Sequence, residues 1–364
     1  MASRRTRGPV LVAMSGGVDS SVAAALMVKR GYDVVGVTLQ IWQESQTDPR
    51  HAGCCSLGAV EDARRVAKTL GIPHYVFNFK DAFRQSVIDN FVEEYERGRT
   101  PNPCVQCNKH VKFDLLAQKM RELGCELLVT GHYARIRRAA DGRYRLLRAR
   151  AASKDQSYVL YMLDQAQLGC VYFPLGELSG KSEARQIARD FGLSVADKPE
   201  SQDICFVSEA GGYREFLRSK RPEMFQGGEI VDAEGRRLGE HEGLPDFTIG
   251  QRRGLGVSSD RPLYVLRLDA ANRRVVVGGK DALATREVAV GEVVWGVPPL
   301  GPMRVDAKIR YNMPAKRATL LPDGERSRLV FDEPVSAVTP GQIAVAYVGQ
   351  TVAMGGTIEP VATV

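Results

Sequence analysis

The chain has 364 residues, 44% of them hydrophobic and 26% charged, which is typical of a soluble globular protein with two or three domains. No apolar run approaches the roughly 18–20 residues that a membrane-spanning helix needs, and seven irregularly spaced cysteines do not resemble a disulfide framework. The net charge of +7 fits a polyanionic partner and a basic small-molecule enzyme equally well.

The first half of the chain alternates strand and helix patterns. Residues 9–14 (PVLVAM) are a short apolar run typical of a buried strand, and they continue into SGGVDS without the cleavage pattern of a signal peptide. Helical patterns follow at 20–31, 59–71 and 82–98, and strand patterns at 33–40, 74–79 and 126–134. This order predicts an α/β domain with a doubly wound parallel sheet and ligands at the C-terminal strand ends.

Residues 134–154 carry seven arginines and one lysine against a single aspartate, which suits a solvated hairpin and an RNA-binding surface alike. After about residue 205 the chain reads as short strands and turns, and from about 286 as a small barrel. We therefore expect three domains: an α/β domain, a central β-rich domain and a C-terminal β-barrel. Their expected bounds are 1–208, 209–285 and 286–364.

Residues 11–21 (LVAMSGGVDSS) have the composition of a phosphate-binding loop between a strand and a helix. Gly16 and Gly17 allow a tight turn and a close approach to a ligand, while the serines and the helix N-terminus offer donors to a phosphate. Asp19 is unusual there, because a carboxylate repels phosphate unless a metal ion or a positioned amide intervenes. An ordinary Gly-Gly turn with Asp19 as the N-cap is the alternative. The common patterns G-x-x-x-x-G-K-[ST] and G-x-G-x-x-G are both absent from the loop.

Cys104 and Cys107 form a C-x-x-C pair that suits a zinc site, a redox dithiol, a cluster or a nucleophile. A zinc site would need a second pair of ligands at metal spacing, which the sequence lacks, and the proline-rich context does not match a thioredoxin. Cys107 directly precedes a helix predicted from residue 108, a position that stabilises a thiolate. Cys125 and Cys170 lie in apolar surroundings typical of packing residues. The segment with His51, Cys54 and Cys55 suits a metal site or a loop leading into the next helix.

The glycine-rich loop resembles that of the ATP pyrophosphatase (PP-loop) superfamily. The resemblance implies that ATP, with Mg²⁺, is cleaved between its α and β phosphates and that a carbonyl-type oxygen is activated as an adenylate. Because one loop carries this resemblance, a small-molecule ATP-dependent synthetase of the same superfamily remains the alternative at this point.

Later segments extend the similarity to the whole chain: TPNPCVQCNKHVKF, VTGHYAR, KDQSYVLYML, SQDICFV, GLPDFTIGQRRGLG and VTPGQIAVAY. They occur in the order found in bacterial tRNA-specific 2-thiouridylases. That resemblance implies ATP-dependent replacement of the C2 oxygen of wobble uridine 34 by sulfur in tRNAs for Lys, Glu and Gln, with release of AMP and pyrophosphate. A non-enzymatic tRNA-binding module would leave the phosphate loop without a purpose.

The resemblance also implies that the domain at 1–208 is the ATP-binding catalytic domain, that the domain at 209–285 binds tRNA, and that individual residues have specific roles. Cys107 attacks or releases the sulfur, Cys205 carries it as a persulfide, and a disulfide between them forms after transfer. The residues implied to contact ATP are Ala13, Met14, Ser15, Gly16, Gly17, Val18, Asp19, Ser20, Leu39 and Gly131. Those implied to contact tRNA are Asn102, Pro103, Cys104, His132, Lys154, Asp155, Gln156, Arg310, Tyr311 and Gln342. Around Arg310 and Tyr311 the sequence IRYNMP departs from the Arg- and Gln-richer family pattern.

Some relatives carry Asp at the position of Cys104. Three thiols, Cys104, Cys107 and Cys205, can hold a [4Fe–4S] cluster and leave one iron open to bind a sulfide. The alternative is that Cys104 is a spectator and the persulfide route is unchanged. The expected partners are tRNA and a sulfur donor protein, either a cysteine desulfurase or a relay carrier, and we expect a cytoplasmic monomer that binds no membrane.

Overall fold

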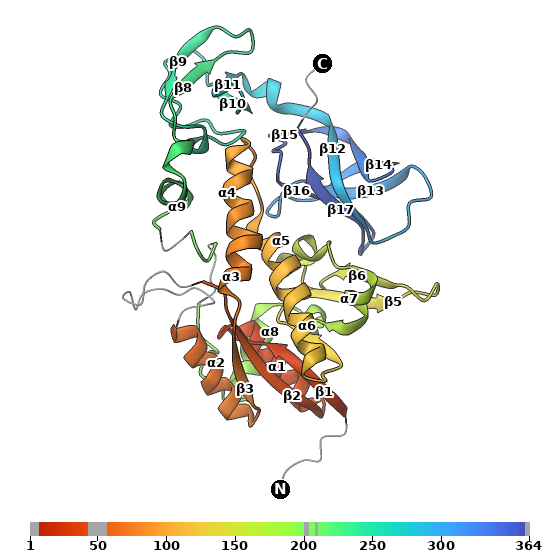
Figure 1. Cartoon of the computed structure of the whole chain (residues 1–364). Coiled ribbons are helices and arrows are strands. Elements are labelled where there is room, and N and C mark those ends of the chain that lie inside the picture. The colour runs from red at the N-terminus through yellow and green to blue at the C-terminus, as the bar shows by residue number, and fades with distance from the viewer. Residues whose placement is uncertain (1–6, 43–56, 200–203, 208–209, 361–364) are drawn as a thin grey trace. The chain divides into compact units, whose positions relative to one another are not determined.

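The structure is a computed structural model that describes residues 7–42, 57–199, 204–207 and 210–360 (Figure 1). These residues fall into two compact units. The first holds those within 1–87, 104–209 and 350–352, and the second holds those within 88–103, 210–349 and 353–364. Both units therefore combine segments that are far apart in the sequence.

The first unit is built on a parallel sheet of five strands in the order β3-β2-β1-β4-β7. Its central strand pairs Val10 with Val34 on one side and with Leu127 on the other. Val10, Leu11 and Val12 are fully buried, as expected for a parallel strand covered on both faces. The predicted doubly wound sheet is confirmed. The strands are β1 (Arg7–Ala13), β2 (Tyr32–Gln40), β3 (His74–Asn78), β4 (Leu127–Val129) and β7 (Val171–Tyr172).

Helices cover this sheet (Figure 1). The first, α1 (Val18–Lys29), is apolar on nearly all sides, and it packs against β1, β2 and two further helices, α2 (Leu57–Leu70) and α8 (Lys181–Asp190). On β4 lies α6 (Leu116–Glu122), which continues the π-helical η2 (Cys107–Leu115). The other helical segments of this unit are α3 (Lys80–Phe83), η1 (Arg84–Ile88), η3 (Ala152–Lys154), η4 (Ser157–Leu160), α7 (Gln165–Cys170) and η5 (Pro174–Glu177).

The arginine-rich segment forms an antiparallel hairpin of β5 (Ala134–Arg138) and β6 (Tyr144–Arg148). A hairpin was one of the two interpretations that its sequence suggested. Acidic side chains accompany some of its arginines. Arg137 forms an ion pair with Glu177, and Arg145 forms one with Asp141. These ion pairs offset part of the positive charge of the hairpin.

The second unit contains a four-stranded sheet in the order β10-β11-β8-β9. Its core includes Ile230, Val265 and Val275, each fully buried. Two helices also belong to this unit, and Phe91 of α4 (Asp89–Glu96) packs edge-to-face on Phe216 of α9 (Tyr213–Lys220). The strands are β8 (Gly228–Val231), β9 (Arg237–His241), β10 (Tyr264–Asp269) and β11 (Arg274–Gly278), and short helical turns are η6 (Pro222–Met224), η7 (Leu244–Asp246) and η8 (Lys280–Leu283).

Six antiparallel strands at the end of the chain form the predicted barrel. Their order is β12-β15-β14-β13-β16-β17, and pairing of β12 with β17 closes it. Val290, Leu320 and Phe331 are among the buried side chains of its core. The strands are β12 (Ala284–Trp295), β13 (Met303–Lys308), β14 (Lys316–Asp323), β15 (Arg326–Ser336), β16 (Ile343–Val348) and β17 (Thr351–Ile358).

In the described part of the chain, no helix is both long enough and apolar enough to cross a membrane.

Candidate functional site

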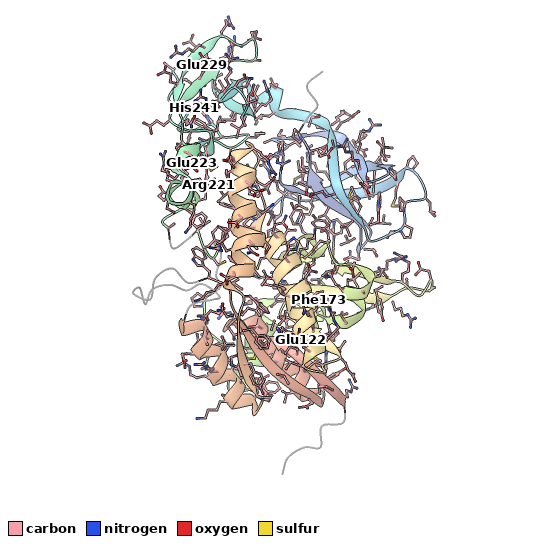
Figure 2. All side chains as sticks on the ribbon, viewed as in Figure 1. Glu122, Phe173, Arg221, Glu223, Glu229 and His241 are labelled. Carbon is pink, nitrogen blue, oxygen red and sulfur yellow. The ribbon has the colours of Figure 1, made fainter. Side chains whose placement is uncertain are left out.

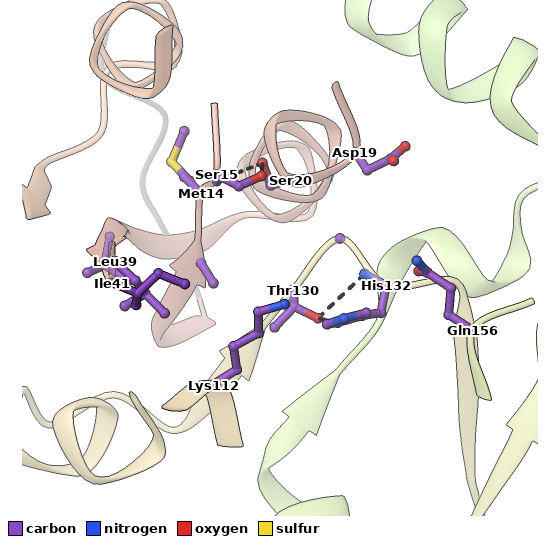
Figure 3. A pocket seen from close by; sticks show the side chains of 13 residues that line it. Met14, Ser15, Asp19, Ser20, Leu39, Ile41, Lys112, Thr130, His132 and Gln156 are labelled. Atoms are coloured by element: carbon purple, nitrogen blue, oxygen red, sulfur yellow. Dashed lines mark hydrogen bonds between the residues drawn. The ribbon is translucent and has the colours of Figure 1, made fainter. Parts of the chain in front are cut away.

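A cavity of about 210 Å³ opens in the first unit where β1 and β2 end (Figure 3). The carboxyl edge of a parallel sheet is where ligands bind in doubly wound folds. Apolar side chains of β2 and the residue after it contribute one part of the lining. The end of β1, the loops after β1 and β4, the start of α1, η2 and the residue before η4 contribute the other groups, most of them polar. The lining residues are Ala13, Met14, Ser15, Asp19, Ser20, Val37, Leu39, Ile41, Lys112, Thr130, Gly131, His132 and Gln156.

The predicted phosphate loop borders this cavity and is held by its own hydroxyl groups. The Ser15 N–H donates to Ser20 Oγ at 3.0 Å, and the Ser21 hydroxyl donates to the Gly17 carbonyl at 2.8 Å. Gly16 has a φ of +67°, and a Cβ placed there would lie 2.1 Å from the carbonyl oxygen of Ala59 in α2. The loop therefore requires glycine at this position, for its backbone conformation and for its packing.

Asp19, the unexpected carboxylate of the loop, has two partners. Its Oδ1 accepts a hydrogen bond from the Tyr133 hydroxyl at 2.8 Å, and its Oδ2 accepts one from Lys181 Nζ, also at 2.8 Å. The lysine is the first residue of α8 and is mostly buried. Tyr133 and Lys181 were not predicted as site residues, and the sequence signal for Lys181 is only a lysine at a helix start, after Gly180. The Lys181 ammonium offsets the negative charge that would repel a phosphate, and the Tyr133 hydroxyl adds a hydrogen bond.

Gly131 brings the loop after β4 against the start of α1. A Cβ on Gly131 would lie 2.7 Å from the backbone nitrogen of Ser20. This close approach lets the predicted nucleotide-contact residues Gly131 and Leu39 line the same cavity as the phosphate loop.

His132, which also lines the cavity, is surrounded by protein. Its Nδ1 lies 2.7 Å from the Thr130 hydroxyl (Figure 3). Its ring packs edge-to-face on Phe173, which is labelled in Figure 2, with 5.9 Å between the ring centroids. Burial lowers the pKa of His132 well below its ordinary value, and the positive charge of Lys112 lowers it further. His132 is therefore neutral at physiological pH and acts as a hydrogen-bonding group rather than as a cation.

This lowered pKa predicts a loss of stability in mild acid. Below pH 6.5 the unfolded chain takes up a proton on His132 and the folded chain does not, so the free energy of unfolding falls by up to about 1.4 kcal/mol between pH 7.5 and 5.5 from this group. Thermal unfolding at the two pH values measures the loss, and His132→Gln should reduce it. The same substitution at half-buried His110 is the control, and an equal loss in wild type and His132→Gln would contradict the assignment.

The helix that carries the C-x-x-C pair begins earlier than the sequence predicted. Pro103 opens α5 (Pro103–Gln106), and η2 continues from Cys107, so Cys107 lies one turn inside the helical segment rather than directly before it. Proline is favoured in the first helical turn because its missing N–H has no helical partner there. Cys104 is exposed and Cys107 is buried.

Cys205 is half-buried, and its neighbour Phe206 anchors the segment. The fully buried ring of Phe206 packs edge-to-face on Phe83 of α3, with 5.9 Å between centroids. Because α3 also packs against η2, whose first residue is Cys107, the segments that carry the two predicted catalytic cysteines both contact α3.

Among the residues that the structure describes, no three His, Cys, Asp or Glu side chains are grouped as a metal site would require. The three predicted cluster ligands, Cys104, Cys107 and Cys205, are all within this part of the chain. His51, Cys54 and Cys55 lie outside the described residues.

Two of the three residues predicted to contact tRNA near the hairpin hold the local backbone. Asp155 accepts hydrogen bonds from the backbone N–H groups of Ala149 and Ser157. Gln156 Oε1 accepts one from the Tyr133 N–H at 2.9 Å and lines the cavity. Lys154 ends the short helix η3 and is half-buried.

The remaining tRNA-contact predictions lie in the second unit. Gln342 Nε2 donates to the carbonyl oxygens of Thr100 and Pro101, at 2.9 and 3.2 Å, and so holds the backbone just before Asn102 and Pro103. The Arg310 guanidinium donates to the Thr339 hydroxyl at 3.1 Å. The exposed ring of Tyr311 lies 5.6 Å from Lys308 Nζ.

Three family models match consecutive parts of the chain. They are described as tRNA methyl transferase HUP domain, tRNA methyl transferase PRC-barrel domain and Aminomethyltransferase beta-barrel domain, and they match residues 8–209, 214–279 and 285–358.

Curated relatives match over almost the whole chain. A protein of Moorella thermoacetica named tRNA-specific 2-thiouridylase MnmA is 51% identical over 362 residues, which cover 97% of this chain and 100% of the relative. Proteins of the same name from Geobacter metallireducens and Clostridioides difficile are 48% and 44% identical, with 99% and 96% of this chain covered and 99% and 98% of theirs. The chain therefore belongs to the family of tRNA-specific 2-thiouridylases.

Proposed function

We propose that this protein is an ATP-dependent tRNA-uridine 2-sulfurtransferase that replaces the C2 oxygen of uridine 34 by sulfur. The observation that carries the proposal is a phosphate loop bordering a cavity, in a chain that matches 2-thiouridylases from end to end. The tRNAs for Lys, Glu and Gln are the proposed substrates. A sulfur donor protein, either a cysteine desulfurase or a relay carrier, supplies the sulfur, and the enzyme acts as a cytoplasmic monomer.

The first step is adenylation of the base. The C2 oxygen of the uridine attacks the α-phosphate of ATP, pyrophosphate leaves, and the poor leaving group becomes part of an adenylate. The phosphate loop and α1 N-terminus orient the phosphates, and the apolar side chains of Leu39 and Ile41 suit the adenine ring. Asp19 is the one carboxylate among the described lining residues, and its oxygens have lone pairs left to hold Mg²⁺, which would neutralise phosphate charge.

The second step is sulfur transfer. The terminal sulfur of a Cys205 persulfide attacks C2 and displaces AMP, which leaves the base joined to Cys205 through two sulfurs. The Cys107 thiolate then attacks the Cys205 sulfur, so the S–S bond to the base breaks, thiouridine is released and a Cys107–Cys205 disulfide remains. An external thiol must reduce this disulfide before the next turnover.

A cluster-bound sulfide is the second proposed sulfur source. The persulfide route needs two thiols, whereas a [4Fe–4S] cluster needs Cys104 as a third ligand. In the described part of the chain, the three cysteines are not grouped as the ligands of one metal site. Iron and sulfide analysis after anaerobic purification distinguishes the routes. Thiolation by iron-free protein supplied with a persulfide donor would exclude an obligatory cluster.

Incubation with ATP and bulk tRNA tests the proposed function. AMP should form only when tRNA is present, and digested tRNA should contain 2-thiouridine once a sulfur donor is added. AMP formation that depends on a free metabolite instead of tRNA would support the competing class, a small-molecule synthetase.

We expect tRNA affinity to fall steeply with salt, because phosphate contacts release counterions. If about six phosphates are contacted, the affinity should fall by roughly 10³-fold between 50 and 200 mM salt. Filter binding or fluorescence anisotropy at a series of salt concentrations measures the slope. Salt-insensitive binding of tRNA would contradict this prediction. The wobble base must leave the stacked anticodon to reach Cys107, and tight binding of a free anticodon trinucleotide would also contradict the proposed mode of binding.

A further inference from the structure

Lys198 contacts the phosphate loop from a distant part of the chain. Its Nζ donates to the carbonyl oxygen of Gly16 at 3.0 Å and to Asp62 Oδ2 at 2.6 Å. Both side chains of this ion pair are largely shielded from solvent, at 28% and 19% exposed. Lys198 therefore connects the phosphate loop to α2 through these two hydrogen bonds. The loop also packs directly on α2 at Gly16.

The bond to Gly16 controls the direction of a phosphate-binding group. In a trans peptide the C=O and the following N–H point to opposite sides of the chain, and no described peptide bond is cis. When Lys198 holds the Gly16 carbonyl oxygen, the Gly17 N–H is directed to the other side, at the N-terminus of α1. The first N–H groups of a helix have no intrahelical partner and bind phosphates.

The backbone around Lys198 is joined to the loop by a second route through α8. Arg185 donates to the carbonyl oxygens of Ala196 and Lys198, at 2.9 and 3.0 Å. One turn earlier on the same helix, Lys181 donates to Asp19. The segment 196–198 is therefore tied to the phosphate loop at Gly16 directly and at Asp19 through α8.

We propose that Lys198 is a positioning residue that holds the phosphate loop ready for ATP. This role rests on the proposed function for the identity of the ligand, ATP, and is independent of the sulfur-transfer step.

Calorimetric titration with α,β-methylene ATP, without tRNA, tests this role of Lys198. Loss of a shielded charged hydrogen bond should make Lys198→Met bind the analogue about 10- to 100-fold more weakly than the wild type, and Lys198→Arg should recover part of the affinity. Asp197→Asn is the matched control: it removes a neighbouring exposed ion pair with Arg189 and should leave affinity unchanged. Equal affinity of wild type and Lys198→Met would overturn the proposal.

Thermal unfolding of each variant identifies a folding defect. If Lys198→Met is unfolded, the comparison uses Lys198→Arg and Asp62→Asn instead. Both of these variants must then bind the analogue more weakly than the wild type.

Wild-type protein that binds the analogue but makes no thiouridine would refute the proposed function and leave the role of Lys198 in ATP binding standing.

Discussion

Replacing Cys205 by serine is expected to lower the yield of thiolated tRNA by at least about 1000-fold while tRNA-dependent AMP formation stays within about twofold of the wild type. The hydroxyl of serine cannot carry a persulfide, so sulfur transfer stops. Adenylation uses groups that line the cavity around the phosphate loop, and Cys205 is not among them. Chromatography of digested tRNA measures the thiouridine, and radiolabelled ATP measures AMP.

Cys170→Ser is the matched control for this prediction. Burial raises the pKa of the Cys170 thiol, and the same cause raises that of Cys125, so neither is a ready nucleophile at neutral pH. Thiolation should be unchanged in Cys170→Ser. Cys107→Ser should block release of thiouridine from Cys205. Normal thiolation by Cys205→Ser would show that the persulfide forms on another residue.

Replacing Asp19 by alanine or asparagine is expected to reduce AMP formation by about 100- to 1000-fold with either substitution. Asp19 accepts hydrogen bonds from Lys181 and Tyr133, and it lines the cavity beside the phosphate loop. Asn keeps the size of the side chain but removes the charge, which leaves the mostly buried Lys181 ammonium without its carboxylate. The rate of AMP release with saturating tRNA measures the effect.

Asp81→Asn, at an exposed position of α3, is the matched control and should keep the full rate. Thermal unfolding separates a chemical effect from a folding defect. If Asp19→Asn is folded and releases AMP at the wild-type rate, Asp19 has no role in nucleotide chemistry and the Lys181 pair is structural.

Local sequence patterns were sufficient to predict the fold class. Apolar runs such as residues 9–14 predict buried strands because a parallel strand must be covered on both faces, and β1 is buried as expected. The alternation of strands and helices predicted the parallel sheet, and regular short strands predicted the closed barrel. The glycines and serines of residues 11–21 predicted the phosphate loop, since tight turns and donor groups leave a local signature.

The sequence by itself therefore determined the fold class, the position of the phosphate loop and the family. Only the tertiary structure decided which groups meet at that loop: Lys181 is 162 positions from Asp19, and Lys198 is 182 positions from Gly16. Hydrophobic periodicity reports the neighbours of a residue along a helix or strand, and it contains no information on contacts over such separations. The partners of Asp19 and Gly16 follow instead from the packing of α8 and the segment 196–198 around α1, which brings distant side chains to one end of the sheet.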